Sequence, residues 1–248
     1  MSPRPRSAMI LGAGLGTRMR PLTDDRPKPL VELAGRALID RTLAKLQRVG
    51  VLRVVVNVHY RADQLEAHLA GRKYPDVLIS NERAGLLDTG GGVGRALDLL
   101  GAGPFFIHNC DTFWIDGEAG AEDTLERMVA LWDPDRMDSL LLLADPATSI
   151  GYDGPGDFIC GADGRLSRGR AEGGNDDRAA MVFAGVSIAD RRLFDDAPGN
   201  AYSLNVLWDR AIAAGRLFGL GHQGTWMHIG SPAALAEAER ILQGEAWR

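Results

Sequence analysis

The first apolar run of the chain leads into the sequence Met9-Ile10-Leu11-Gly12-Ala13-Gly14-Leu15-Gly16-Thr17-Arg18-Met19-Arg20-Pro21-Leu22-Thr23. Three glycines at alternate positions follow the apolar residues, and cationic side chains come soon after them, including Lys28. Glycine lets backbone N–H groups approach an anion without an obstructing Cβ, and the start of a turn or helix adds a favourable dipole. The stretch therefore predicts a strand that ends in a phosphate-binding loop.

Two better-known phosphate loops do not fit this spacing. A dinucleotide fingerprint has a third glycine where this chain has Thr17, and it needs a helix directly behind, which Pro21, Pro27 and Pro29 would interrupt. A P-loop needs Gly-Lys-Ser/Thr, whereas the chain continues Thr17-Arg18-Met19. For the loop alone, a glycine-rich connection without any ligand stays an alternative; the cations at fixed offsets favour phosphate.

Composition is typical of a globular protein. The chain has 248 residues, 45% of them hydrophobic and 25% charged, which suits one large α/β domain. A net charge of −5 argues against broad nucleic-acid binding, and no apolar run is long enough to span a membrane. Cys110 and Cys160 have neither metal-site nor disulfide-framework spacing, so we expect a reduced, cytoplasmic setting. Residues 1–6 are expected to be a disordered arm, and residues 7–248 a single domain; oligomeric state is not predicted.

Apolar runs of strand length alternate with segments of helical period, which predicts a mostly parallel sheet covered by helices. From residue 148 onward, frequent glycines separate shorter strands, and Ala162-Asp163-Gly164-Arg165 is expected to be a hairpin turn. Predicted strands cover about 8–12, 53–58, 77–80, 104–110, 138–144, 157–160, 166–168, 181–188, 218–221 and 225–229. Predicted helices cover 38–49, 63–70 with Asp63 as N-cap, a short segment after the glycines at 90–92 through Leu100, 124–132, 204–214, and 232–242 with Ser231 as N-cap.

Two further places have the character of a site. Gly90-Gly91-Gly92 before a helix would let backbone press against a nucleobase or ribose, although a flexible connector is an equal alternative. Asp111 follows a buried strand, at the edge where open α/β sheets bind ligands. It is the best metal-ligand candidate, with a turn or helix cap as the alternative.

Several motifs together resemble one enzyme family. They are Leu11 to Thr23 with Lys28-Pro29-Leu30, Asp88-Thr89-Gly90-Gly91-Gly92, Asn109-Cys110-Asp111 and Thr225-Trp226-Met227-His228-Ile229-Gly230-Ser231-Pro232. This ordered set is similar to the signature of the sugar-1-phosphate nucleotidylyltransferases (NDP-sugar pyrophosphorylases) and extends over nearly the whole chain. The resemblance implies an α/β fold with a Rossmann-like, mixed and mostly parallel sheet flanked by helices, and a smaller β-rich sugar-binding portion. It also implies a Mg²⁺-dependent reaction in which a sugar 1-phosphate oxygen attacks the α-phosphorus of a nucleoside triphosphate and expels pyrophosphate.

The resemblance also assigns roles to residues. The half covering about 7–145 would bind the nucleotide, and the half covering about 146–248 the acceptor sugar. Arg18 and Lys28 would neutralise phosphate charge and Asp111 would hold the metal, which suits a reaction between two anions that needs alignment and charge neutralisation more than a protein nucleophile. The nucleotide-binding residues implied are Leu11, Gly12, Ala13, Gly14, Leu15, Gly16, Thr17, Arg18, Glu82, Asp88, Thr89 and Gly90.

One position departs from the family pattern. Where members commonly have Trp, one residue and then a second metal-binding Asp, this chain has Trp226-Met227-His228. Imidazole is a poorer Mg²⁺ ligand than carboxylate. His228 would therefore bind the metal directly, act through water, or leave Asp111 alone to anchor Mg²⁺ with the reactants' phosphates; the last two together are favoured. A hydrogen-bonded histidine at a strand end is the structural alternative.

Substrate expectations follow from the same resemblance. The segment Leu87 to Gly92 and the compact length are most similar to members that use UTP and N-acetylmuramic acid 1-phosphate in peptidoglycan recycling. Mannose-1-phosphate guanylyltransferases are the second candidate, because similar short members are often assigned that activity. Glu82 or Arg83 could read the base edge, and the sequence leaves the choice of base open. Glu172, Asn175 and Asn205 are the candidate sugar-binding residues. A nucleotide-binding module that has lost turnover is an alternative suggested by His228, and a dehydrogenase is a weaker one.

Overall fold

Seven strands form the central sheet of the computed structural model, which describes residues 3–117, 122–169 and 179–245. The spatial order is β12-β8-β11-β6-β1-β4-β5, and β11 alone runs antiparallel to its neighbours. The strands are β1 (Ser7–Leu11), β4 (Arg53–Val58), β5 (Asp76–Asn81), β6 (Phe105–Asn109), β8 (Ser139–Ala144), β11 (Val182–Ala189) and β12 (Leu217–Gly221). The prediction of a mixed, mostly parallel sheet is confirmed.

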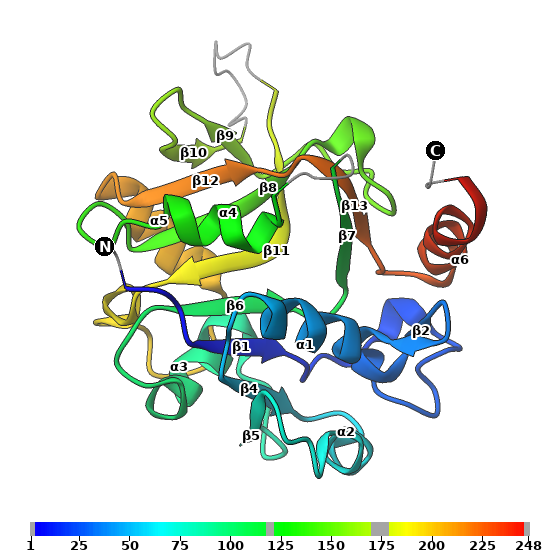
Figure 1. Ribbon diagram of the computed structural model, residues 1–248. Coiled ribbons are helices and arrows are strands. Elements are labelled where there is room, and N and C mark those ends of the chain that lie inside the picture. Colours follow the sequence, from blue (N-terminus) through cyan, green and yellow to red (C-terminus); the bar gives the residue numbers. More distant parts are fainter. Residues whose placement is uncertain (1–2, 118–121, 170–178, 246–248) are drawn as a thin grey trace.

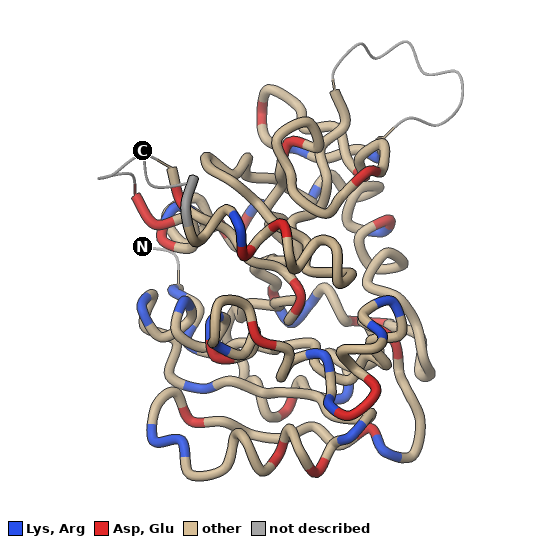
Figure 2. Tube along the Cα trace, turned by 90° about the vertical axis from the view of Figure 1, so that its right-hand side faces the viewer, with Lys and Arg blue, Asp and Glu red and all other residues tan. Residues whose placement is uncertain are grey.

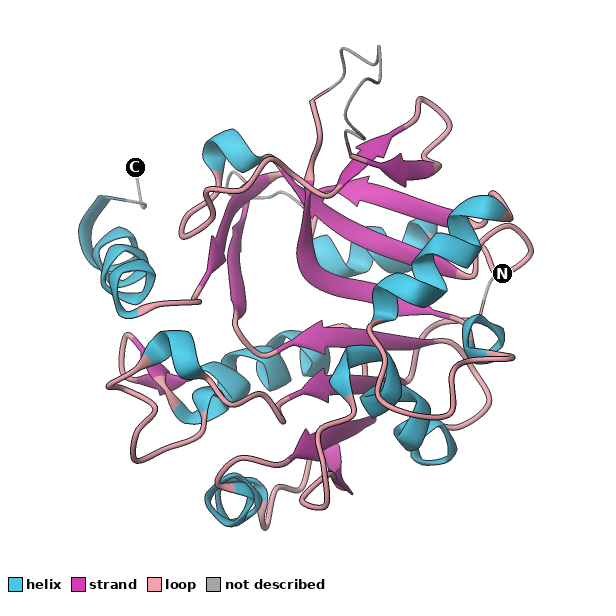
Figure 3. Ribbon diagram, turned by 180° about the vertical axis from the view of Figure 1, so that it is seen from behind, coloured by secondary structure: helices cyan, strands magenta, loops and turns pink. Residues whose placement is uncertain are grey.

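Helices cover both faces of this sheet. Figure 1 shows α1 and α4 in front of it and α3 and α5 behind it, and Figure 3 shows the reverse side. The helices are α1 (Leu38–Arg48), α2 (Ala62–Leu69), α3 (Asp88–Leu100), α4 (Thr124–Leu131), α5 (Leu204–Ala213) and α6 (Pro232–Arg240), which continues into a π-helical turn at Ile241–Glu245. Within the described ranges, every helix is too short or too polar to cross a lipid bilayer.

The alternation of side chains along each strand divides the core into two layers. Ala8 and Ile10 of β1 pack with α1, α2 and α4, whereas Met9 between them packs with α3 and α5. Each fully buried Val, Leu or Ile contributes about 1.5–3 kcal/mol relative to exposure, so an apolar strand of this kind is stabilised from both sides. This explains why runs such as Val54-Val55-Val56 contain no polar alternation.

Three small two-stranded pairs lie outside the central sheet. They are β2 (Glu32–Leu33) with β3 (Arg36–Ala37), β9 (Phe158–Cys160) with β10 (Leu166–Arg168), and β7 (Thr112–Asp116) with β13 (Gly224–His228). The predicted hairpin between β9 and β10 is present. The ribbon of β7 and β13 is antiparallel, and it pairs Thr112 with His228. It packs on a third apolar cluster that includes Met19, Leu33, Met227 and Leu235.

Three local expectations need correction. Asp63 is not the N-cap of α2; Arg61 holds that position, and Asp63 lies in the first turn, where it pairs with Arg83. Helix α3 starts at Asp88, so the three glycines lie inside the helix and not before it. Strand β7 was not predicted at all.

The segment expected to be a disordered arm is described from residue 3 onward. The Arg4 guanidinium donates to the Val49 carbonyl at 2.8 Å and pairs with Glu126 at 2.5 Å. The Arg6 carbonyl accepts from the Leu52 amide at 2.8 Å. These contacts join residues 4–6 to the end of α1 and to α4.

Charged residues of both signs are interspersed along the trace, as Figure 2 shows. The net charge of −5 leaves no basic surplus of the kind typical of nucleic-acid-binding proteins.

Candidate active site

A cavity of about 530 Å³ lies at the carboxyl ends of β1 and β6. Parallel strands of an open α/β sheet present their carboxyl ends to the ligand, so this is the expected place for a site. The lining residues are Leu11, Gly12, Ala13, Gly14, Gly16, Thr17, Arg18, Met19, Lys28, Glu82, Leu86, Asp88, Thr89, Asn109, Cys110, Asp111 and Ala201. Segments that are far apart in the sequence therefore line the same cavity.

The glycine-rich loop is held in shape from behind. Gly16 has a φ of 64°, in the left-handed region, and a Cβ there would lie 3.2 Å from the Cβ of Lys28. The Thr23 hydroxyl donates to the Gly16 carbonyl at 2.8 Å, and a 3-10 turn, Thr17–Met19, follows. A Cβ on Gly14 would meet nothing within 4 Å. The loop is thus fixed at Gly16 and open at Gly14.

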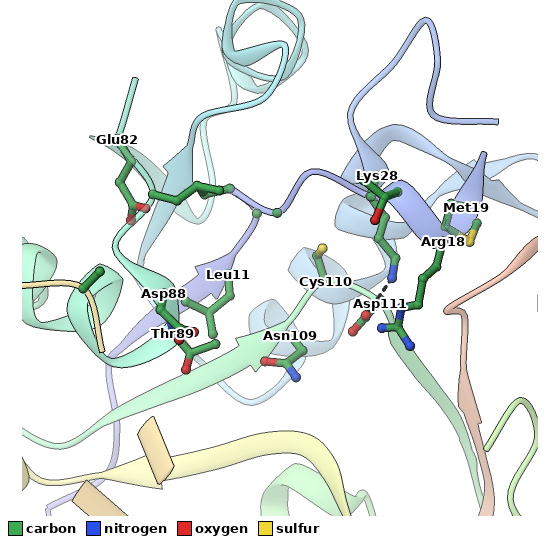
Figure 4. A pocket seen from close by; sticks show the side chains of 17 residues that line it. Leu11, Arg18, Met19, Lys28, Glu82, Asp88, Thr89, Asn109, Cys110 and Asp111 are labelled. Atoms are coloured by element: carbon green, nitrogen blue, oxygen red, sulfur yellow. Dashed lines mark hydrogen bonds and ion pairs between the residues drawn. The ribbon is translucent and has the colours of Figure 1, made fainter. Parts of the chain in front are cut away.

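Lys28 and Asp111 form a nearly buried ion pair at one end of the cavity. Lys28 Nζ lies 2.7 Å from Asp111 Oδ2, and the two side chains are 10% and 18% exposed. Figure 4 shows this contact as a dashed line, with the exposed side chain of Arg18 extending toward the same end of the cavity. Three charged groups from two distant segments therefore converge where phosphate charge is expected.

His228 reaches the same aspartate from the β7–β13 ribbon. Its Nε2 lies 3.4 Å from Asp111 Oδ2, and the Ile229 amide donates to the Asp111 carbonyl at 2.8 Å. The imidazole stacks on Trp226 with a ring separation of 6.1 Å, and a Cβ on Gly230 would approach the ring to 2.7 Å. The ribbon therefore fixes the orientation of His228 toward Asp111.

The electrostatics of this end keep Asp111 ionised. Burial alone would raise the pKa of Asp111, but hydrogen bonds and charge from His228 and Lys28 outweigh it and hold the pKa well below its usual value. Burial raises the pKa of the neighbouring Cys110 thiol to about 12. Cys110 is therefore a neutral thiol at physiological pH and unsuited to be a nucleophile.

The other end of the cavity is formed by Glu82, Leu86, Asp88 and Thr89. Glu82 is 2% exposed, and both of its carboxylate oxygens are engaged: Oε1 accepts from Asn57 at 2.7 Å, and Oε2 from the Leu87 amide at 3.3 Å. Figure 4 shows Glu82, Asp88 and Thr89 on the far side of the view from Lys28.

Most of the predicted nucleotide-binding residues line the cavity, together with Lys28 and Asp111. Leu15 and Gly90 do not: Leu15 is 44% exposed, and a Cβ on Gly90 would meet the Tyr202 ring at 2.4 Å, so Gly90 faces Tyr202 in the segment before α5. Arg83 lies outside the lining and pairs with Asp63 and Glu66.

The predicted sugar-binding residues are not brought to the cavity. Asn205 lies on the first turn of α5, where its side-chain oxygen accepts from Arg168 at 3.0 Å. Glu172 and Asn175 fall outside the described residues.

Sequence reasoning missed Asn57, which lies behind the loop at 3% exposure and accepts from the Gly12 amide at 2.7 Å. A signal existed, because Asn57 interrupts the valine run of a strand that is buried from Val54 to Val58. Asn109 and Met19 also line the cavity. Both belong to motifs quoted above, but the sequence assigned them no role, because whether they face the cavity depends on the packing around β6 and the loop.

The donors at the Asp111 end of the cavity bear on whether the site suits a metal ion. Among the described residues, no group of three His, Cys, Asp or Glu side chains is placed to hold one. An ionised, nearly buried carboxylate at the cavity does fit Mg²⁺, which proteins commonly bind through one or two carboxylates plus water and substrate phosphates. The donor set therefore suits a metal that arrives with an anionic reactant.

Comparisons with known proteins agree with this geometry. A family model described as a MobA-like NTP transferase domain matches residues 8–145. N-acetylmuramate alpha-1-phosphate uridylyltransferase of Caulobacter vibrioides is 47% identical over 246 residues, covering 98% of this chain and 99% of the relative. Mannose-1-phosphate guanylyltransferase catalytic subunit beta of Dictyostelium discoideum is 41% identical over 107 residues, or 42% of this chain and 30% of the relative.

Solved structures show the same fold at low identity. The inositol-1-phosphate CTP transferase from T. maritima has a TM-score of 0.75 at 17% identity, over 98% of this chain and 99% of the other. The full-length similarity and the matching domain lead to one conclusion: the chain belongs to the sugar-1-phosphate nucleotidylyltransferase family and is a nucleotidyltransferase.

Proposed function

We propose that this protein transfers a uridylyl group from UTP to N-acetylmuramic acid 1-phosphate, with release of pyrophosphate, in peptidoglycan recycling. The observation that carries the proposal is the 47% identity to a uridylyltransferase of that name over 98% of the chain. The mannose-1-phosphate guanylyltransferase similarity ends after 42% of the chain, which favours UTP and the muramic acid substrate over GTP and mannose 1-phosphate. Because its substrates are phosphorylated metabolites, we place the reaction in the cytoplasm.

The proposed chemistry is an in-line transfer. A phosphate oxygen of the sugar 1-phosphate forms a bond to the α-phosphorus of UTP, the bond from that phosphorus to the β-phosphate bridging oxygen breaks, and pyrophosphate leaves with the electron pair. Catalysis of this kind depends on alignment and charge stabilisation. No protein nucleophile is required, which agrees with the neutral state of Cys110.

Each charged group has a proposed role in this transfer. The backbone from Gly14 to Thr17 would follow the triphosphate, with Arg18 against its charge. Lys28 would lie beside the α-phosphate and the incoming sugar phosphate, because its Nζ is held at the cavity by Asp111 at 2.7 Å. An Arg fork matches phosphate oxygens, and a Lys ammonium supplies a point charge that can follow the reacting phosphate.

Asp111 would hold Mg²⁺, with His228 acting on Asp111 and on water and not as a direct ligand. When bound, the metal would neutralise phosphate charge. The motivation for an indirect role is the 3.4 Å contact from His228 Nε2 to the carboxylate and the preference of hard cations for oxygen. Residues 7–248 would form one catalytic unit, because β7, which directly follows Asp111, pairs with β13, which carries His228.

The test is pyrophosphate release by the purified protein with Mg²⁺, in which UTP, GTP, dTTP, CTP and ATP are crossed with four sugar 1-phosphates. These are N-acetylmuramic acid 1-phosphate, N-acetylglucosamine 1-phosphate, mannose 1-phosphate and glucose 1-phosphate. We expect turnover confined to UTP with the muramic acid substrate. Turnover with GTP and mannose 1-phosphate would replace the proposal, and nucleotide binding without turnover for any pair would make the protein a binding module.

A further inference from the structure

A buried polar bridge runs behind the cavity and joins its two ends. The Gly12 amide donates to Asn57 Oδ1 at 2.7 Å, Asn57 Nδ2 donates to Glu82 Oε1 at 2.7 Å, and the Leu87 amide donates to Glu82 Oε2 at 3.3 Å. Asn57 and Glu82 are 3% and 2% exposed. Buried polar groups are costly unless they are hydrogen-bonded, and here every side-chain polar atom of the pair has a partner.

Packing alone does not require these residue types. The other inward positions around Asn57 in β4 are valines, which bury well without any polar partner. Among the described residues, no Lys, Arg or His lies within ion-pair distance of the Glu82 carboxylate, so Asn57 and the Leu87 amide are its direct partners. The buried Asn57–Glu82 pair is therefore not explained by apolar packing of the core.

Helix α3 is shaped to leave room for the pair. A Cβ on Gly92 would lie 2.8 Å from Glu82 Oε1 and 2.9 Å from Asn57 Nδ2. Both distances are shorter than a carbon atom tolerates, so an alanine at this position would displace the bridge. Gly92 thus has a structural explanation that is independent of ligand contact.

The bridge joins segments that lie at opposite ends of the cavity. Gly12 is the first residue of the phosphate loop, and Leu87 directly precedes Asp88 and Thr89 at the other end of the cavity. Leu87 is also tied to the second half of the chain, because its carbonyl accepts from the Tyr202 amide at 3.1 Å. A nucleoside triphosphate is held at its phosphates and its base at the same time, so the separation of the two segments has to match the nucleotide.

We propose that Asn57 and Glu82 are positioning residues that set the separation between the phosphate loop and the base-side segment for the nucleoside triphosphate. This inference rests on the proposed nucleotidyl transfer. In it, the Glu82 carboxylate acts through its two protein partners and does not itself read the base.

The bridge offers a test by exchange of its polar groups. Asn57→Asp places a carboxylate against Glu82, where two anionic oxygens meet at hydrogen-bond distance. Glu82→Gln keeps the contact with Asn57 but turns an amide N–H₂ toward the Leu87 N–H, donor against donor. The double variant Asn57→Asp/Glu82→Gln restores every bond: the carboxylate at position 57 accepts from Gly12 and from the amide at position 82, whose oxygen accepts from Leu87.

The experiment that tests this compares KM for UTP, KM for the sugar 1-phosphate, kcat and the melting temperature of the wild type, the two single variants and the double variant. We expect KM for UTP to rise by about tenfold in each single variant, because Glu82→Gln sets donor against donor and Asn57→Asp sets carboxylate against carboxylate. KM for the sugar 1-phosphate should change by less than about twofold. The double variant returns to within about threefold of the wild type, and Gly92→Ala behaves like the single variants. Gln47→Glu makes the same amide-to-acid change at an exposed position of α1 and serves as the matched control.

Three results overturn the inference. One is a double variant as impaired as the worse single variant, which would mean that the Glu82 carboxylate contacts the base directly. The second is an equal change in both KM values in the single variants. The third is a lower melting temperature of the single variants with unchanged KM for UTP. If the single variants do not fold, the kinetics of the double variant alone decide. If the wild type turns over no pair, the proposed function fails, and equilibrium binding of UTP to the same four proteins still tests the bridge.

Discussion

Replacement of Lys28 by methionine separates the catalytic from the structural contribution of its ammonium group. The substitution keeps most of the apolar length of the side chain and removes the charge that lies 2.7 Å from Asp111 Oδ2. Removing one preorganised charge or donor from an active site typically lowers kcat by about 10²–10³. We expect a loss of that size in Lys28→Met, because the group is proposed to neutralise charge that develops at the α-phosphate.

The same substitution should lower stability. Breaking a buried ion pair by removing one partner costs about 3–5 kcal/mol, and since the two side chains are 10% and 18% exposed we expect the lower end, about 3 kcal/mol. The pKa of Asp111 should also rise, because Lys28 is one of the two groups that lower it. The double variant Lys28→Met/Asp111→Asn removes both charges of the ion pair, so it should recover most of the lost stability and none of the activity.

Pyrophosphate release gives kcat, and urea denaturation gives the free energy of unfolding. Lys73→Met, at an exposed position, is the matched control and should leave both quantities unchanged. The reasoning fails if Lys28→Met keeps kcat within about tenfold of the wild type, or if the double variant is less stable than the single one.

Three further predictions concern pH, the loop and the metal. Burial lowers the pKa of His108 from 6.5 to about 4, so the fold is most stable above pH 6.5, and up to about 3 kcal/mol of the free energy of unfolding is lost as the pH falls toward 4. The melting temperature of His108→Phe should therefore fall less over this range than that of the wild type. An unchanged pH profile would contradict this prediction. Gly16→Ala forces a Cβ into a φ of 64° against Lys28, so it should lower the free energy of unfolding by about 1 kcal/mol and raise KM for UTP. Gly35 has a similar φ of 70° and no neighbour within 4 Å, so Gly35→Ala should lower stability without changing KM. Equal KM values in the two variants would refute the loop argument. Chelation with EDTA should abolish pyrophosphate release and added Mg²⁺ should restore it, whereas turnover that persists in EDTA would exclude a role for the metal at Asp111.

Local sequence was sufficient for most elements of the sheet. The run from Arg53 to Val58 was predicted with the bounds that β4 has, because a strand buried on both faces is apolar throughout. The N-cap at Ser231 was also predicted correctly, since its hydroxyl accepts from the Ala234 amide three residues on. Such features depend on neighbours within a few residues, which the sequence displays directly.

Elements that depend on distant partners were missed or misplaced. Strand β7 pairs only with β13, more than one hundred residues later, so nothing near Thr112 indicates it. Glycine disfavours helices, which is why Gly90 to Gly92 were expected to precede α3. Glycine is required inside the helix because a Cβ would meet Tyr202 at Gly90, the Asn200 carbonyl at Gly91, and Glu82 with Asn57 at Gly92.

The sequence by itself determined the family, the alternation of strands and helices, and the glycine-rich loop with its cations, because all of these are written in contiguous residues. Only the tertiary structure decided which side chains meet: Lys28 with Asp111 and His228, and Asn57 with Glu82. The members of each group come from different strands and loops, so their contacts are set by strand order and register. The distances and pKa values of the site therefore depend on how the folded chain packs those segments against one another.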